Sequence, residues 1–208
     1  MTVANREGSS STFVDERVAA TYKWFNTVVI GQKLCPFAPP LKQKPELMRV
    51  VCSPEDSSRS QAIKLVQQEI QALYGSDAPQ HETTLVILDL PGWSNDFREF
   101  IRLSWDLQEQ LVEQTGLVGS LQLVLFHPMA THQTYGGFME GEEDNPADYT
   151  IRSPYPTVHL LREVDVLKAV QGGYPQLETL PMRNQAKLVQ QGLELCQQRL
   201  ADCYPKEK

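Results

Sequence analysis

Apolar side chains near the start of the chain recur at helical spacing. They lie four, three and four residues apart, at Val18, Tyr22, Phe25 and Val29. This spacing places them on one face of a helix. The pattern predicts an amphipathic helix over roughly residues 13–30, and Gly31 is suited to end it.

Two further helical stripes alternate with three apolar runs. The stripes comprise Ile63, Val66, Ile70 and Leu73, then Phe100, Leu103, Leu107 and Leu111. The runs cover residues 48–52, 83–90 and 121–126 and are predicted to be strands. The middle run shows no polar alternation, which favours a central strand covered on both faces.

A fourth strand is predicted inside an unusually polar segment, residues 152–163, which reads Arg-Ser-Pro-Tyr-Pro-Thr-Val-His-Leu-Leu-Arg-Glu. Its two prolines favour extended backbone at the entry, and residues 157–161 are β-branched or apolar apart from His159. On a strand, Thr157, His159 and Leu161 share one face, and Val158, Leu160 and Arg162 share the other. A histidine and an arginine on such a strand need partners.

The C-terminal part predicts a short helix over residues 164–170 and a last helix beginning near Pro181. The expected buried stripe of the last helix is Met182, Ala186, Val189, Leu193, Cys196, Leu200 and Cys203. This spacing makes Cys196 and Cys203 core residues without a chemical role.

Helices that alternate with apolar strands predict an α/β fold, with a small, mainly parallel or mixed four-stranded sheet flanked by helices. A ferredoxin-like α+β sandwich is the alternative. We expect a flexible N-terminus over residues 1–12 and a single globular domain over residues 13–205, which is ordinary for a chain of 208 residues.

The composition narrows the function classes. A formal net charge of −7 argues against a sequence-independent nucleic-acid binder, and no apolar run approaches the length of a membrane span. The N-terminus lacks the apolar core of a signal peptide, so we expect a soluble cytoplasmic protein without disulfides. Motifs for a dinucleotide, a P-loop or a zinc ribbon do not occur. The cofactor and the oligomeric state stay open, and a small-molecule ligand is compatible with the sequence.

A connection of about 29 residues with little regular pattern joins the third strand to the fourth, over residues 128–156. Connections in compact domains are usually about 4 to 6 residues long, so one of this length is functional or disordered. Its aromatic residues, among them Tyr135, Phe138 and Tyr149, argue against simple disorder.

Several motifs together resemble one known family. They are Val29-Ile30-Gly31, Leu34-Cys35-Pro36-Phe37-Ala38, Phe126-His127-Pro128, the segment 152–163 and Arg183-Asn184. The chain is similar, from about Phe13 to the last helix, to the domain of unknown function 1415, a family of uncharacterised bacterial and plant proteins. The resemblance implies a shared site without identifying its chemistry. One departure is Ala130, where family members tend to have an aromatic residue, so the loop geometry is expected to differ.

Cys35, His127 and His159 lie at element ends or on a strand, and they suggest an enzyme site if they converge. Cys35 would be the nucleophile, His127 or His159 its base, and Asp144 or Asp148 the group that orients the imidazole. Tyr155 would donate to developing negative charge. An anionic substrate, a carboxylate or a phosphate, would be bound by guanidinium groups. The residues expected to bind it are Arg152, Ser153, Arg162, Arg183 and Asn184.

Two other hypotheses compete with the enzyme. Cys35, His127, His159 and Asp144 are acceptable zinc or iron ligands, although their spacing matches no known signature. Alternatively, the protein is a non-catalytic binding or scaffold domain that uses the 128–156 connection, and Cys35 is simply a buried small residue.

Overall fold

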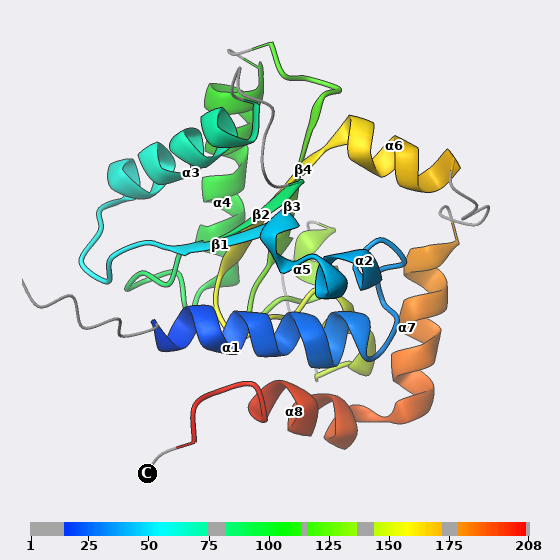
Figure 1. The fold of residues 1–208 in the computed structure, drawn as a ribbon. Coiled ribbons are helices and arrows are strands. Elements are labelled where there is room, and N and C mark those ends of the chain that lie inside the picture. Colours follow the sequence, from blue (N-terminus) through cyan, green and yellow to red (C-terminus); the bar gives the residue numbers. More distant parts are fainter. Residues whose placement is uncertain (1–14, 75–81, 114–115, 137–143, 172–178, 207–208) are drawn as a thin grey trace, which may run out of the picture.

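A mixed four-stranded sheet is the centre of the fold. The computed structural model describes residues 15–74, 82–113, 116–136, 144–171 and 179–206. The sheet has the order β1-β2-β4-β3 (Figure 1). Its strands are β1 (Met48–Cys52), β2 (Thr83–Ile87), β3 (Leu121–Phe126) and β4 (Thr157–Arg162). β1 and β2 are parallel, and β4 is antiparallel to both of its neighbours.

The structure confirms the predicted α/β fold with a mixed four-stranded sheet. A ferredoxin-like sandwich has the chain order β-α-β-β-α-β, whereas here a helix separates β2 from β3. β2 is buried along its whole length, as its unbroken apolar run predicted. The alternation predicted for β4 is also confirmed, because Val158 and Leu160 enter one core layer while His159 and Leu161 face the other side.

Two helices cover one face of the sheet, α3 (Arg59–Tyr74) and α4 (Phe97–Leu107), and the π-helical turn η3 (Gln108–Glu113) extends α4. Phe100, Leu103 and Leu107 of α4 are almost completely buried against Leu125 of β3 and Val158 of β4. Asp96 caps α4, its side chain accepting a hydrogen bond from the N–H of Glu99. The apolar stripes of α3 and α4 therefore form the main core, as their helical periodicity required.

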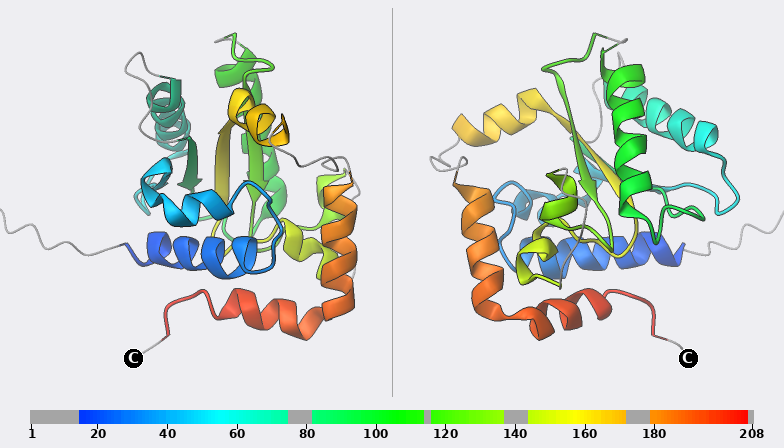
Figure 2. Two further views of the ribbon diagram at one scale, coloured as in Figure 1. Left: turned by 45° about the vertical axis from the view of Figure 1, so that its right-hand side comes forward. Right: turned by 180° about the vertical axis from the view of Figure 1, so that it is seen from behind.

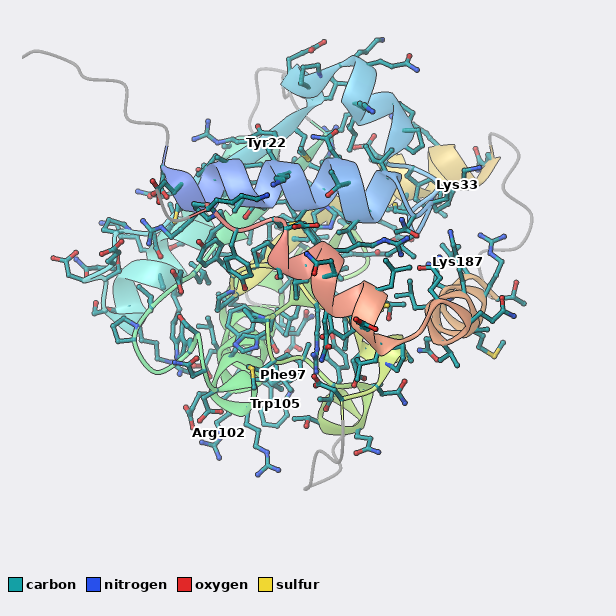
Figure 3. The ribbon with its side chains drawn as sticks, turned by 90° about the horizontal axis from the view of Figure 1, so that it is seen from below. Tyr22, Lys33, Phe97, Arg102, Trp105 and Lys187 are labelled. Atoms are coloured by element: carbon teal, nitrogen blue, oxygen red, sulfur yellow. The ribbon has the colours of Figure 1, made fainter. Side chains whose placement is uncertain are left out.

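The other face of the sheet carries α1 (Glu16–Trp24), which continues as the π-helix η1 (Phe25–Ile30). The figures show α1 and the C-terminal α8 (Leu193–Ala201) along the same side of the molecule (Figures 2 and 3). Trp24 and Phe25 pack there with Cys196 and Cys203 in a second core. The α1–η1 segment ends at Gly31, where a Cβ would lie 2.2 Å from the carbonyl oxygen of Thr27, so no larger residue fits this backbone.

Short elements fill the connections. α2 (Pro39–Gln43) and η2 (Pro45–Leu47) precede β1, and α6 (Glu163–Gln171) follows β4 directly. The connection between β3 and β4 contains α5 (His132–Tyr135) and the 3-10 helix η4 (Pro146–Thr150). Of these two, η4 packs against α7 (Leu180–Gln191). The described parts of this connection therefore include two short helices.

The prediction of one long C-terminal helix was wrong. The chain forms two helices, α7 and α8, separated at Gly192, whose φ of 85° lies in the left-handed region that favours glycine. Because the chain turns at this break, the predicted apolar stripe does not stay on one buried face. The side chains of Met182 and Val189 are 64 % and 53 % exposed. Cys196 and Cys203 are core residues, as predicted.

Residues 1–12, for which a flexible terminus was predicted, lie outside the described part of the chain. Among the helices that are described, none combines the length and the apolar character that crossing a bilayer requires.

The packing of α4 generates a stability prediction. Phe100 is completely buried at the centre of the main core, so Phe100→Ala should lower the free energy of unfolding by about 3–5 kcal/mol. Met182→Ala, at a side chain that is 64 % exposed, should change it by less than about 0.5 kcal/mol. Urea denaturation followed by circular dichroism measures both changes. Equal losses in the two variants would contradict the assigned core.

Candidate functional site

A cavity of about 490 Å³ lies between the face of the sheet that carries α1 and the segment from η1 to α2. This volume is within the range of small-molecule sites. The walls are mainly aromatic and aliphatic, formed by Trp24, Phe25, Val29, Pro36, Phe37, Ala38, Pro40, Leu41, Leu85, Val124, Phe126, Leu161 and Val166. The polar lining residues are Cys35, Glu82, Thr83, Gln122, His159 and Asp165.

Cys35 is placed in the cavity wall by a tight turn. The N–H of Ala38 donates to the carbonyl oxygen of Cys35 across 3.4 Å. Burial raises the pKa of the Cys35 thiol, and backbone hydrogen bonding from Phe37 and Ala38 acts in the opposite direction, because it stabilises the thiolate. The backbone of this turn therefore favours the thiolate, against the effect of burial.

A helix from the far end of the chain holds this turn. The buried Nδ2 of Asn184, on α7, donates to the carbonyl oxygen of Leu34 at 2.6 Å. Leu34 directly precedes Cys35 and is itself buried. Asn184, predicted to bind substrate, therefore contacts the backbone beside Cys35.

His159 borders the same cavity from the centre of the sheet. Its Nε2 lies 2.5 Å from Thr83 Oγ1, and that hydroxyl donates to the carbonyl oxygen of Leu160 at 3.0 Å. The threonine hydrogen is committed to Leu160, so Nε2–H of His159 is the donor and Nδ1 carries the lone pair. Burial lowers the pKa of His159 to about 4, so the imidazole is neutral at pH 7.

Cys35 and His159 thus share one cavity. None of the hydrogen bonds among the described residues joins their side chains. Trp24 also lines the cavity, and its Nε1 is buried without a hydrogen-bond partner in the described structure. An unpaired buried donor is costly, and a ligand oxygen in the cavity could satisfy one that faces it.

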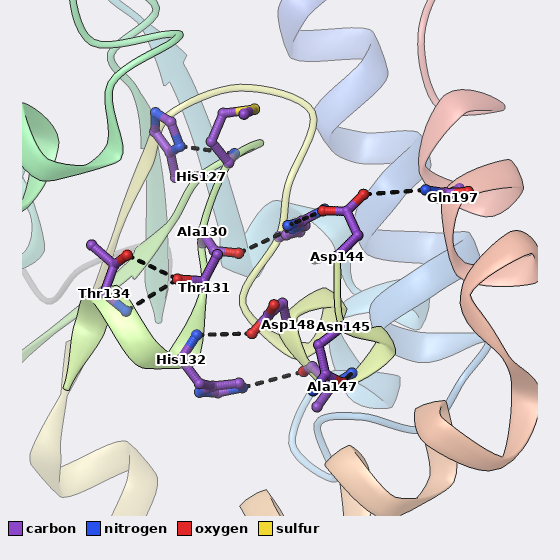
Figure 4. Close-up of polar contacts among 12 residues, drawn as sticks. His127, Ala130, Thr131, His132, Thr134, Asp144, Asn145, Ala147, Asp148 and Gln197 are labelled. Carbon is purple, nitrogen blue, oxygen red and sulfur yellow. Dashed lines mark hydrogen bonds and ion pairs between the residues drawn. The ribbon is translucent and has the colours of Figure 1, made fainter. Parts of the chain in front are cut away.

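The structure separates His127 from this pair. His127 is completely buried among Phe97 and Phe100 in the α3 and α4 layer. Its Nδ1 accepts from the N–H of Met129 at 2.9 Å (Figure 4), and its Nε2 donates to the carbonyl oxygen of Trp93 at 2.6 Å. Both nitrogens are occupied, so His127 fixes the end of β3, and it does not line the cavity that Cys35 borders.

Arg152, Asp144 and Asp148 form structural contacts in the connection before β4. Arg152 donates to the carbonyl oxygen of Ala130 at 3.0 Å and pairs with Asp144 at 2.9 Å (Figure 4). This ion pair lowers the pKa of Asp144. The Asp148 carboxylate accepts from the N–H of His132 at 2.8 Å. None of these three predicted site residues lines the cavity.

The remaining predicted residues lie elsewhere. Ser153 Oγ donates to the carbonyl oxygen of Tyr155, and the Tyr155 ring packs against Tyr204 beyond the N-terminal end of β4. Arg162 pairs with Asp165 at 2.5 Å. Arg183 is exposed on α7.

The cavity also has residues that the sequence alone did not single out, chiefly Thr83, Gln122 and Trp24. Thr83 belongs to the apolar run predicted as a central strand. Its role depends on the antiparallel register that places Leu85 opposite His159, and no local signal gives that register.

The four alternative metal ligands are not gathered. Cys35 and His159 line the cavity, His127 lies across the sheet, and Asp144 pairs with Arg152. Within the part of the chain that the structure describes, no group of three His, Cys, Asp or Glu side chains is arranged to hold a metal ion.

Fold and cavity together define an α/β protein with a mixed sheet and a mainly apolar cavity that carries a thiol and a neutral imidazole. The family model described as "Protein of unknown function (DUF1415)" matches residues 16–198. The chain belongs to this family, which confirms the resemblance seen in its motifs. No match was found among curated proteins or among solved structures.

The buried state of His127 predicts a pH dependence of stability. Burial lowers its pKa from 6.5 to about 4 in the folded protein, so between these values the unfolded chain binds more protons. The His127 contribution to the free energy of unfolding is complete above pH 6.5 and is lost as the pH falls. At pH 4 the loss is about 3 kcal/mol. Urea denaturation between pH 4 and 7 measures this loss. His127→Gln should make the pH dependence shallower and leave the part that comes from His159, whose pKa is also lowered to about 4. An unchanged slope would refute the assignment.

The contact between Asn184 and Leu34 predicts a further loss. Asn184→Ala leaves the buried Leu34 carbonyl without its donor, so the free energy of unfolding should fall by about 1–3 kcal/mol. Gln190→Ala is the matched control, because it changes an exposed amide on the same helix. A loss that is no larger for Asn184→Ala than for Gln190→Ala would show that the contact does not hold the turn.

Proposed function

We propose that the cavity is the active site of an enzyme that acts on a small, mainly apolar molecule, with Cys35 as the nucleophile. The observation that carries this proposal is that Cys35 borders the same 490 Å³ cavity as His159, and that backbone hydrogen bonding from Phe37 and Ala38 favours its thiolate. Nucleophilic thiol sites need a stabilised sulfur and a nearby proton acceptor.

The lining argues for the substrate class. Among the described residues, no lysine or arginine borders the cavity, and its charged lining residues, Glu82 and Asp165, are acidic. The arginines predicted to bind an anion lie outside it. Burial of a substrate among the aromatic and aliphatic walls would supply the binding energy, at about 25 cal/mol for each Å² of apolar surface. The proposal therefore favours a neutral or weakly polar substrate over a carboxylate or phosphate.

In the proposed step, Cys35 Sγ forms a bond to an electrophilic carbon of the substrate. The thiol proton passes to Nδ1 of His159, which has no hydrogen-bond partner among the described residues. The proton then leaves with the departing group. The N–H groups of Phe37 and Ala38 stabilise the negative charge that develops on sulfur. Thr83 fixes the tautomer of the imidazole through Nε2, so Asp148 and His127 have no part in this step.

The resting state follows from burial. The pKa of Cys35 is raised above its usual value and the pKa of His159 is about 4. Both groups are therefore neutral at pH 7. A neutral pair costs less to bury than a thiolate and an imidazolium. The thiolate would form only with substrate in place, which limits unwanted reactions of the sulfur with solvent oxidants.

Site-resolved alkylation tests the proposal. The protein is treated with N-hexyl chloroacetamide, which is neutral and apolar, or with chloroacetate, and the rate at each cysteine is measured by mass spectrometry. Each rate is divided by the rate with free glutathione. Cys35 should prefer the apolar reagent by about tenfold, the effect of about 1.4 kcal/mol of binding. His159→Gln should slow the labelling of Cys35 without changing that of Cys52.

Cys52 is the internal control, because it is also half-buried but does not line the cavity. It is the last residue of β1, which begins at Met48. Its pKa is raised to about 12 by burial. A Cys35 that shows no greater preference for the apolar reagent than Cys52 would sink the proposal. So would a labelling rate at Cys35 that is the same in His159→Gln as in the unchanged protein.

A further inference from the structure

β3 forms one edge of the sheet and is unusually unprotected. Within the described part of the chain it pairs only with β4, and its sequence, Leu121 to Phe126, contains neither a charged residue nor a proline. Natural edge strands normally carry such residues, because an open row of N–H and C=O groups recruits other strands. Among the described residues, no backbone hydrogen bond from another segment reaches residues 122–126 on the outer side.

A groove of about 400 Å³ runs beside this edge, between α4 and β3, on the face of the sheet opposite the Cys35 cavity. Its floor is Ile101, Leu123 and Leu125. Trp105 and Tyr135 border it and are 67 % and 51 % exposed. Tryptophan, tyrosine and arginine are the residues that dominate protein interfaces.

The charges along α4 and η3 are segregated apart from Glu99, which lies between the two N-terminal arginines and pairs with Arg102. Arg98 and Arg102 lie in the N-terminal half, and Asp106 and Glu109 lie towards the C-terminal end. Arg102 and Trp105 lie close together at the margin of the molecule (Figure 3). Arg102 pairs with Glu99 and Asp106 pairs with Arg59. Arg98 and Glu109 have no hydrogen-bond or ion-pair partner within the described part of the chain.

We propose that this groove and the β3 edge bind a second copy of the chain, in a two-fold dimer that joins the two β3 strands antiparallel. A two-fold axis sets the same surface against itself in reverse order. With the axis near residue 103 of α4, Arg98 of each copy faces Glu109 of the other. Arg102 then faces Asp106 and the exposed Trp105 ring, to which a guanidinium can bind.

The dimensions are compatible with this arrangement. Arg98 to Glu109 spans about 16 Å of helix, and the six residues of β3 span about 20 Å. The groove is lined by both segments. One axis can therefore pair the strands and oppose the helices at the same time. The self-complementary charge order favours a second copy over an acidic or basic partner, which would match only half of the helix.

Sedimentation equilibrium of the full chain over a wide range of concentration tests the dimer. Arg98→Glu and Glu109→Arg should each raise the dimer dissociation constant by about tenfold, because symmetry turns two attractive pairs into repulsive ones. An equimolar mixture of the two variants should dimerise again, since position 98 of either variant then faces the opposite charge at position 109 of the other. The double variant Arg98→Glu, Glu109→Arg should also recover.

Matched controls separate this surface from others. Arg183→Glu changes an exposed arginine on α7 and should leave the dissociation constant unchanged. Trp105→Ala should weaken the dimer, whereas Met182→Ala, at a similarly exposed apolar residue, should not. Leu123→Lys places a charge on the β3 edge and should abolish the dimer. Circular dichroism checks that each variant is folded.

Three results would overturn the proposal. The first is a chain that stays monomeric at every concentration. The second is a dimer that forms equally well with Arg98→Glu, Glu109→Arg and Leu123→Lys, which would place the interface elsewhere. The third is failure of the mixture and of the double variant to recover. A monomer whose Trp105 emission changes only when another protein is added would assign the groove to a different partner.

Discussion

The antiparallel insertion of β4 between β2 and β3 is the constraint on which the rest of the structure depends. Side chains alternate along a strand, so this one strand supplies both layers at once. Val158 and Leu160 enter the core under α3 and α4, while His159 and Leu161 face the cavity. A register shift of one residue would drive the imidazole into the apolar core and move two aliphatic side chains out of it.

Much of this arrangement could be predicted from local pattern. The four strands, the helical stripes and the two faces of β4 follow from periods of about 2 and 3.6 residues. The convergence of Cys35 with His159 on one cavity could not be established from the sequence, because it depends on register and on which face a distant turn covers. His127 shows the same limit. Its place at the end of β3 could be predicted from the sequence. Its hydrogen-bond partner, the carbonyl oxygen of Trp93, is set by tertiary packing.

The arginines show why charged residues are easily assigned to a binding site by mistake. Arg152 and Arg162 were expected to bind a substrate anion, yet each is held by a carboxylate of its own neighbourhood, Asp144 or Asp165. Burial makes an unpaired guanidinium costly, so a conspicuous arginine near a core strand usually has an internal partner. The prediction of the last helix failed for a different reason. Gly192 breaks a stripe whose spacing was regular, since helical periodicity says nothing about a left-handed residue between two helices.

β3 links the two surfaces. Gln122, Val124 and Phe126 of this strand line the cavity, whereas Leu123 and Leu125 form the floor of the groove. An edge strand paired on one side only is held less firmly than an internal one, because half of its backbone groups lack a protein partner. A second strand bound to its free edge would therefore steady the wall opposite Cys35 as well as the groove. Binding at the edge and reactivity in the cavity would then be coupled through a single strand, without any contact between the two ligands.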